Sequence, residues 1–304
     1  MVRKGLILYM SKKLWIGALV CALILTSGHA FAGKNVKTEE EKLKERVNSY
    51  TKVVNVQDDI FLVYAQNSED WGDIAIGKGS KKRVKGSACA CFSLANTIIN
   101  CVPYEELPII REATRYPIRI DSSSIVYGEG KYERASFEIS RNEDYFRFFP
   151  LCIGNMACGN NYGLGDSFGS RGYYEYVLKL YGLEYEKIQE LQDCINILKE
   201  SNAYVIVCSG GSESPIAPKF GHYLVMAKYN DGKIYFLDSV FRDKYKDDKY
   251  GCIHPVEPGL FYVNEEDLDL LKITGTNFIV RPKKSHEKYS TEKIEKLIEL
   301  SNTY

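Results

Sequence analysis

One cysteine, Cys89, lies where a sulfur could act as a nucleophile. The short segment Gly86–Ala88 precedes it, and apolar residues with helical spacing, such as Phe92 and Leu94, follow it. A nucleophilic thiol must lose its proton near neutral pH, and both a helix N-terminus and a nearby imidazolium lower the pKa of cysteine. A cysteine taken alone is more often buried or disulfide-bonded. Cys89 therefore needs suitable partners before a catalytic role can be assigned to it.

The candidate partners of Cys89 are His222 and Asp238. His222 opens an apolar strand directly after a loop that contains two Gly and two Pro residues. The strand would hold the imidazole in place and the loop would expose it, although a histidine at a strand end can also be purely structural. The strands His222–Tyr229 and Lys233–Asp238 are joined by Asn230-Asp231-Gly232, a sequence typical of a β-hairpin. The hairpin therefore brings a base and a carboxylate into one element.

The length of the hairpin turn decides whether these two side chains meet. A two-residue Asp-Gly turn would place Asp238 opposite Val225, on the other face of the hairpin from His222. A three-residue turn with Gly232 left-handed in a bulge would place Asp238 opposite Leu224, on the same face as His222. Such diagonal neighbours lie roughly 7–8 Å apart at the backbone, within reach of an imidazole and a carboxylate. The pairing of His222 with Asp238 therefore predicts a bulged turn.

The segment Gly86–Ala95 reads Gly-Ser-Ala-Cys-Ala-Cys-Phe-Ser-Leu-Ala and resembles the nucleophile segment of papain-like cysteine peptidases. It is most similar to the bacterial bacteriocin-processing (double-glycine) peptidase-like group, whose segment typically reads Gly-Cys-Gly-Pro-Thr-Ser-Leu-Ala. Upstream, Tyr64–Gly72 resembles that group's Gln-x-Asp-x-x-Trp opening. Downstream, further segments follow in the order of the group: Tyr181–Leu183, Ala203–Cys208, Gly221–Tyr223 and Leu237–Ser239. The resemblance extends over more than half of the chain, and its ordered set of segments is more specific than any single one.

This resemblance implies a catalytic triad. Cys89 would be the nucleophile, His222 the base, and Asp238 the residue that orients the histidine. The family's oxyanion-stabilising glutamine would be Gln66, acting together with the Cys89 backbone N–H. In papain relatives this glutamine lies nearer the cysteine, and Arg83 occupies that spacing here. An exposed polar residue after a strand is the alternative interpretation of Gln66, and it has equal weight.

A second thiol, Cys91, stands close to the nucleophile. Ala90-Cys91 replaces the Gly-Pro that typically follows the cysteine of the group. Cys91 could pack in the core, form a disulfide with another cysteine, or control Cys89 by a redox reaction. The sequence favours core packing among these three.

The implied activity is hydrolysis of peptide or isopeptide bonds through a thioester acyl-enzyme. The same triad also serves a thiol amidase or a transglutaminase-type acyl transferase, and an inactive papain-like domain that binds a partner is a third alternative. We expect a peptide or protein substrate, with cell-wall peptide among the candidates. The double-glycine substrate is not carried over, because the sequence shows no transporter segment. No cofactor is expected, and no metal, since the cysteines and histidines lack zinc-ligand spacing.

The first 32 residues predict a secretory signal peptide. Lys12 and Lys13 precede the apolar run Leu14–Leu25, and Ala30–Ala32 supplies a small-x-small cleavage site. The apolar run is shorter than the roughly 20 residues that a membrane span requires. We therefore expect cleavage near Ala32, a secreted or periplasmic protein, and no membrane anchor after cleavage.

Charge and cysteine content indicate which partners and how many disulfides to expect. The 304 residues include 40 Lys+Arg and 40 Asp+Glu, so no net charge attracts nucleic acid, and none is expected as a partner. Nine cysteines occur, and removal of Cys21 with the signal peptide leaves eight. In an oxidising compartment an even set suggests four disulfides, whereas a catalytic Cys89 would leave at least one further cysteine free.

The expected architecture is α+β: a helical part that carries Cys89 packs on a twisted antiparallel sheet that carries His222 and Asp238. Residues 33–58 form a charged lead-in with a helix over Lys37–Val54, residues 59–283 the papain-like domain, and residues 284–304 an amphipathic helix over Thr291–Leu300. Helices are also predicted over Cys89–Cys101, Gly172–Leu180 and Leu191–Glu200, and strands over Asp59–Ala65 and Ala203–Cys208. A last pair of strands is expected in Gly259–Val263 and Asn277–Val280.

Overall fold

The protein has an α+β fold built on a seven-stranded antiparallel sheet. The computed structural model describes residues 50–69, 71–72, 83–103, 106–107, 149–151, 153–154, 171–217, 219, 221–290 and 292–294. Across the sheet the strands lie in the order β3 (Glu184–Ile188), β9 (Ile273–Arg281), β4 (Tyr204–Ser209), β5 (His222–Asn230), β6 (Lys233–Leu237), β8 (Leu260–Asn264) and β7 (His254–Glu257). The predicted α+β class is therefore confirmed.

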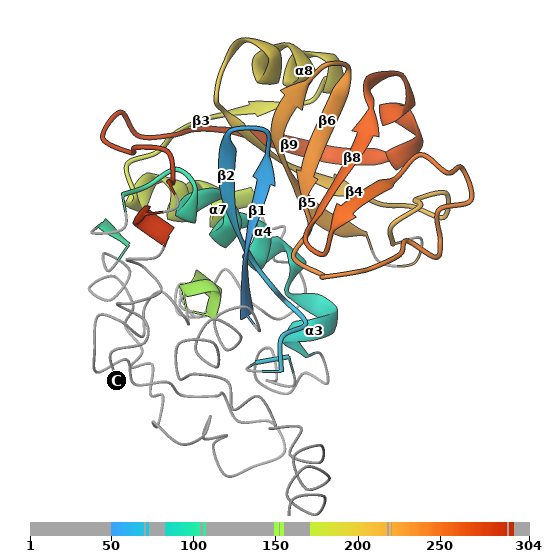
Figure 1. Cartoon of the computed structure of the whole chain (residues 1–304), viewed down its shortest axis with the longest axis horizontal. Coiled ribbons are helices and arrows are strands. Elements are labelled where there is room, and N and C mark those ends of the chain that lie inside the picture. Colours follow the sequence, from blue (N-terminus) through green and yellow to red (C-terminus); the bar gives the residue numbers. More distant parts are fainter. Residues whose placement is uncertain are drawn as a thin grey trace, which may run out of the picture. The chain divides into compact units, whose positions relative to one another are not determined.

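Helices and a small hairpin cover the two faces of the sheet (Figure 1). On one face lie α4 (Cys89–Ile99), α7 (Arg171–Leu180) and the two-stranded hairpin of β1 (Thr51–Val56) and β2 (Asp59–Tyr64). On the other face lie α8 (Leu191–Glu200) and the 3-10 helix η2 (Glu265–Leu271). Side chains of β4 alternate between the two cores, because successive residues of a strand point to opposite faces.

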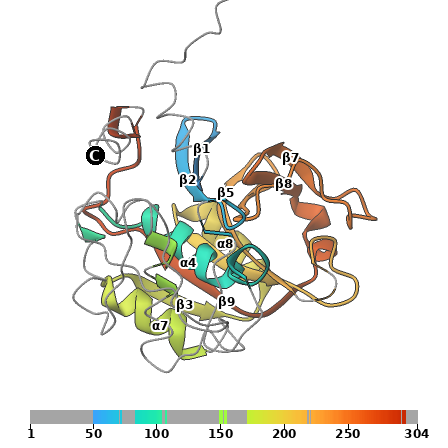
Figure 2. The same ribbon diagram turned by 90° about the horizontal axis from the view of Figure 1, so that it is seen from below.

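Helix α4 is almost entirely enclosed. Ten of its eleven side chains are buried, and Cys89, its first residue, is the exception. Apolar side chains project from several sides of this helix, so it is stable only inside the protein, where it contacts β2, β4 and β5. Figure 2 shows α4 beside the β1–β2 hairpin that it contacts. The predicted helix over Cys89–Cys101 is confirmed over Cys89–Ile99.

Two buried asparagines join α4 to the backbone of β2. Asn96 accepts a hydrogen bond from the Tyr64 N–H at 2.8 Å. Asn100, one turn later on the same helix face, accepts from the Leu62 N–H at 2.9 Å and donates to the Leu62 carbonyl at 2.8 Å. The side chains of α4 thus replace a neighbouring strand for β2, whose buried backbone groups would otherwise lack partners.

Most predicted elements agree with the structure to within about two residues at each end, the usual uncertainty of element boundaries. The predicted strand over Asp59–Ala65 corresponds to β2, and the one over Ala203–Cys208 to β4. The helices predicted over Gly172–Leu180 and Leu191–Glu200 are α7 and α8.

The helix predicted over Lys37–Val54 is wrong at its C-terminal end. Tyr50 is helical, but Thr51–Val56 forms β1 and pairs with β2 across a tight turn. Four of these six residues are the β-branched Thr51, Val53, Val54 and Val56, which favour strands over helices. Residues 37–49 and the predicted signal peptide lie outside the described residues. The folded domain therefore begins before the predicted boundary at Asp59.

The β5–β6 hairpin turns differently from the prediction. Asn230 pairs with Lys233, so the turn has two residues, and both Asp231 (φ 47°) and Gly232 (φ 70°) are left-handed, as a type I′ turn requires. The three-residue bulged turn is therefore wrong. A bulge lies instead at Ala227, where the register shifts by one residue, so that Val225 faces Leu237. Continued by one residue, this register sets Asp238 opposite Leu224, as the pairing with His222 demands.

The two C-terminal strands exist but do not pair with each other. The strand expected over Gly259–Val263 is β8, which lies between β6 and β7, and the strand expected over Asn277–Val280 is part of β9, which lies between β3 and β4. The predicted pairing of these two strands with each other is therefore wrong, because strands that follow one another in the chain need not be neighbours in the sheet. Of the helix expected over Thr291–Leu300, residues 292–294 are helical, and the remainder lies outside the described residues.

We predict that Asn100→Ala destabilises the protein by about 2–4 kcal/mol, because it leaves the buried N–H and carbonyl of Leu62 without partners. Chemical denaturation followed by circular dichroism measures this loss. The matched control is Asn196→Ala on the exposed face of α8, where Gln192 is the hydrogen-bond donor; it should change the free energy of unfolding by no more than about 0.5 kcal/mol. Equal effects of the two variants would contradict the proposed bracing of β2.

Candidate active site

Cys89 occupies the first position of α4, where the backbone N–H groups of a helix lack intrahelical acceptors. The N-cap residue, Ala88, offers no side-chain hydrogen bond, and no acidic residue lies in the first turn. The positive end of the helix dipole is therefore not neutralised by a capping side chain. Cys89 is half-buried, whereas the ten residues that follow it in the helix are buried.

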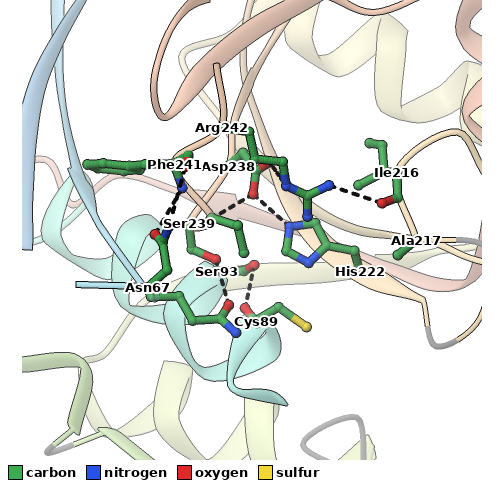
Figure 3. Close-up of polar contacts among 12 residues, drawn as sticks. Asn67, Cys89, Ser93, Ile216, Ala217, His222, Asp238, Ser239, Phe241 and Arg242 are labelled. Atoms are coloured by element: carbon green, nitrogen blue, oxygen red, sulfur yellow. Dashed lines mark hydrogen bonds and ion pairs between the residues drawn. The ribbon is translucent and has the colours of Figure 1, made fainter. Parts of the chain in front are cut away.

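His222 is the first residue of β5, and its side chain is buried. It follows Gly221, whose left-handed backbone (φ +71°) turns the chain into the strand. A Cβ at position 221 would approach the Cys208 sulfur to 3.4 Å. The His222 Nε2 lies 2.6 Å from Asp238 Oδ1 (Figure 3). Because Nε2 is occupied, Nδ1 is the ring nitrogen left to interact with Cys89, whose charge raises the pKa of His222.

Asp238 follows the last residue of β6 and has no solvent exposure. In addition to His222, its Oδ1 accepts a hydrogen bond from the Val240 N–H at 2.9 Å. Its Oδ2 accepts from the Tyr245 hydroxyl at 2.9 Å and lies 3.6 Å from the Arg242 Nε. Both oxygens of this buried carboxylate are thus compensated by donors, as a buried charge requires.

The electrostatic environment favours a thiolate and an imidazolium. Burial raises the pKa of Cys89, but the hydrogen bond and charge of His222, with the N–H groups of Tyr223 and Ala90, bring the net pKa below its ordinary value. Burial lowers the pKa of His222, whereas Asp238 and Cys89 raise it, and the result is about 9. Burial raises the pKa of Asp238, but the positive charges of His222 and Arg242 have the larger effect, so the net pKa is below its ordinary value. The three side chains therefore stabilise one another's charged forms.

Gln66 is buried, so the interpretation as an exposed polar residue is wrong. Its Nε2 donates to the Val84 carbonyl at 2.8 Å, and its Oε1 accepts from the Ser239 hydroxyl at 3.1 Å. Its backbone N–H also donates to the Ser239 carbonyl at 2.6 Å. Of the two Nε2 hydrogens, one has no acceptor among the described residues, so the amide keeps a donor that is not used inside the protein.

The remaining described cysteines lack the environment of Cys89. Cys91 is buried and donates to the Pro150 carbonyl at 2.9 Å, in agreement with core packing. Burial raises the pKa of Cys208 to about 11 and that of Cys252 to about 12. All six described cysteines are free: Cys89, Cys91, Cys101, Cys194, Cys208 and Cys252. The expectation of four disulfides is therefore wrong; Cys152 and Cys158 lie outside the described residues.

Several residues at the site were missed by sequence reasoning. Tyr245 and Arg242 bind Asp238, and Asn67 exchanges two hydrogen bonds with the backbone of Phe241. The segment after β6 has no helical or strand periodicity, so its side chains carried no positional signal. The proximity of Arg242 and Tyr245 to Asp238 in the chain was the one indication available.

Two other kinds of site were searched for in the part of the chain that the structure describes. There, no cluster of three or more His, Cys, Asp or Glu side chains could hold a metal ion. None of the helices with described residues is long and apolar enough to cross a membrane.

We predict that the imidazole of His222 titrates near pH 9 and that Cys89→Ser lowers this value by about one pH unit. The thiolate stabilises the imidazolium, so a neutral hydroxyl in its place removes a favourable charge. Carbon-13 labelling of histidine, followed by NMR across pH 5–11, measures the titration, since the chain has only four histidines. The signal that disappears in His222→Ala assigns the residue. Titration of that signal near 6.5 would contradict the charged pair.

Comparison with known proteins assigns no family to this chain. No protein-family model matches it, and no curated protein matches it in sequence. The chemistry of the site therefore has to be inferred from the positions, hydrogen bonds and charges of its own side chains.

Proposed function

We propose that the protein is a secreted cysteine peptidase of papain-like fold, which hydrolyses peptide or isopeptide bonds through a thioester acyl-enzyme. Cys89 is the nucleophile, His222 the general base and acid, and Asp238 the residue that orients His222. Gln66 and the Cys89 N–H stabilise the oxyanion. The substrate is a peptide or protein, with cell-wall peptide as one candidate.

One observation carries this proposal: a half-buried thiol at an uncapped helix N-terminus interacts electrostatically with an imidazole whose Nε2 lies 2.6 Å from a buried carboxylate. The Asp238 carboxylate favours the imidazolium form of His222, and this imidazolium favours the thiolate form of Cys89. Structural cysteines have no need of such an arrangement, and the other described cysteines with resolved shifts have raised pKa values. Perturbed groups that converge in this way are typical of catalytic sites.

In the first step, the Cys89 thiolate attacks the carbonyl carbon of the scissile bond, a C–S bond forms, and the C=O electron pair moves to oxygen. The Cys89 N–H and the second Nε2 hydrogen of Gln66 donate to this oxyanion. The protonated His222 then gives its Nδ1 proton to the leaving amine as the C–N bond breaks. A thioester on Cys89 remains.

In the second step, neutral His222 takes a proton from water, and the resulting hydroxide attacks the thioester. The acid is released and Cys89 leaves as a thiolate, which restores the imidazolium pair. An amine in place of water would give an acyl transfer with the same residues. Hydrolysis is the simpler assignment, because it requires no second substrate.

The arrangement of secondary structure also supports the proposal. The nucleophile comes from the N-terminus of a buried helix, and the base and carboxylate from neighbouring strands of an antiparallel sheet that this helix contacts. This is the distribution of catalytic residues expected for a papain-like peptidase. Export rests on the signal sequence alone.

We predict that an iodoacetamide probe at pH 6.5 labels Cys89 first and that His222→Ala slows this labelling by about a hundredfold. The thiolate fraction falls tenfold for each unit by which the pKa exceeds the pH. Peptide mass spectrometry of the reduced protein locates the label. Cys208 is an internal comparison, because it is also half-buried but has a pKa of about 11.

The matched control is His254→Ala, which removes a half-buried histidine from β7 and should leave the labelling rate unchanged. Preferential labelling of Cys208 or Cys91, or equal labelling in His222→Ala, would refute the nucleophile assignment. In that case an inactive binding domain would become the better interpretation.

We predict that Gln66→Ala slows acylation of Cys89 by p-nitrophenyl acetate by about 10²–10³-fold, while alkylation by iodoacetamide keeps its rate. Acylation passes through a tetrahedral oxyanion, and alkylation does not. Release of p-nitrophenolate and mass spectrometry follow the two reactions. A parallel loss of both rates would show that Gln66 supports the folded site through Val84 and Ser239 and does not bind the oxyanion.

A further inference from the structure

The Asp238 oxygen that does not contact His222, Oδ2, has binding partners of its own. Oδ1 faces His222 and the Val240 N–H, whereas Oδ2 accepts from the Tyr245 hydroxyl at 2.9 Å and lies 3.6 Å from the Arg242 Nε. Apart from His222, every donor comes from the six residues Val240–Tyr245. One short segment therefore encloses the carboxylate on the side away from the imidazole.

The hydroxyl of Tyr245 is a dependable donor. Its side chain is packed edge-on against Phe261, with ring centroids 5.0 Å apart, and burial raises the pKa of the phenol well above its ordinary value. The phenol therefore keeps its proton wherever Asp238 is ionised. Oδ2 has no other hydrogen bond among the described residues, since Arg242 lies beyond hydrogen-bonding distance.

Arg242 joins the carboxylate to the loop that leads into β5. Its Nη1 donates to the Ile216 carbonyl at 3.0 Å (Figure 3). Its guanidinium lies 5.4 Å from the centre of the Tyr245 ring. Ser214 holds the same loop, because its hydroxyl accepts from the N–H groups of Ile216 and Ala217. Arg242 thus fixes the approach to His222 as well as the charge of Asp238.

The other end of the segment is attached to the part of the fold that carries Gln66. The Phe241 N–H donates to Asn67 Oδ1 at 3.1 Å, and Asn67 Nδ2 donates back to the Phe241 carbonyl at 3.3 Å. Ser239 and Gln66 are joined by two further hydrogen bonds. The segment is therefore held at both ends and can act as a rigid support for the carboxylate.

We propose that Tyr245 and Arg242 are positioning residues that act through Asp238 to hold His222 in line with Cys89. This role rests on the proposed cysteine peptidase function. With the Tyr245 hydroxyl removed, Oδ2 loses its hydrogen bond and the carboxylate turns toward Arg242. The contact with His222 then lengthens, and the imidazolium and the Cys89 thiolate both lose support.

The groups that set the charge of His222 are few. Asp238 and Cys89 face its two sides, and Arg242 and Tyr245 reach it through Asp238. If Tyr245 only screened the negative charge of Asp238, its loss would strengthen the carboxylate and raise the pKa of His222. If it holds the carboxylate in place, its loss lowers that pKa. The direction of the change therefore separates the two roles.

The test is the carbon-13 histidine titration of Tyr245→Phe, combined with iodoacetamide labelling of Cys89 at pH 6.5. We expect the His222 titration to move down from about 9 by about one pH unit and labelling to slow by about tenfold. The matched control is Tyr229→Phe on β5, which removes a tyrosine–carboxylate hydrogen bond to Glu265 away from the site. It should change neither quantity.

Arg242→Lys and Arg242→Gln provide a second comparison if Tyr245→Phe does not fold. Lysine keeps the positive charge beside Asp238, so the His222 signal should titrate close to the wild-type pH. Glutamine removes that charge, and the His222 signal should then titrate at a lower pH. An upward or absent shift in Tyr245→Phe, or equal titrations in the two Arg242 variants, would overturn the positioning role. Wild-type labelling that does not depend on His222 would instead refute the peptidase function, and the titration would still report on Tyr245.

Discussion

A buried carboxylate sets the strictest condition on this structure. Asp238 is completely removed from water, and an ionised side chain in that position is tolerated only when donors satisfy both oxygens. His222 meets one oxygen at 2.6 Å, and Tyr245 meets the other at 2.9 Å. His222 stands at the start of β5, and Tyr245 lies in the segment after β6, so both ends of the β5–β6 hairpin contribute to the enclosure of Asp238. Once these are fixed, so is the direction of the imidazole.

The accessibility of Cys89, the proposed nucleophile, depends on a different condition, the burial of α4. Helix packing leaves only its first residue accessible, so the thiol is also the point where the helix dipole meets solvent. Asn96 and Asn100 lock the helix to β2, and Gln66 at the end of β2 is bonded to Ser239, next to Asp238. The two parts of the site are thus connected by the asparagine side chains that bind β2 and by the backbone hydrogen bond between Gln66 and Ser239.

The hairpin shows how a correct expectation about the proximity of two side chains, His222 and Asp238, can rest on a wrong local structure. His222 and Asp238 can lie on the same face of the hairpin only if the strand register shifts by one residue. The sequence predicted this shift at the turn. Asp231-Gly232 instead forms the type I′ turn that its composition favours, and Ala227 supplies the bulge within β5. A bulge inside a strand has no reliable sequence signal, because its position is determined by the packing of the surrounding sheet.

The sequence by itself determined the elements whose signals are local: the apolar helix after Cys89, the β5–β6 hairpin, and the residue types Cys, His and Asp that suit thiol chemistry. Only the tertiary structure decided which side chains meet. Tyr245 and Arg242 at Asp238, the buried amide of Gln66, the free cysteines, and the strand β1 in place of a helix all depend on contacts between distant parts of the chain. Propensity and periodicity describe each segment separately, whereas burial and hydrogen bonding are settled between segments.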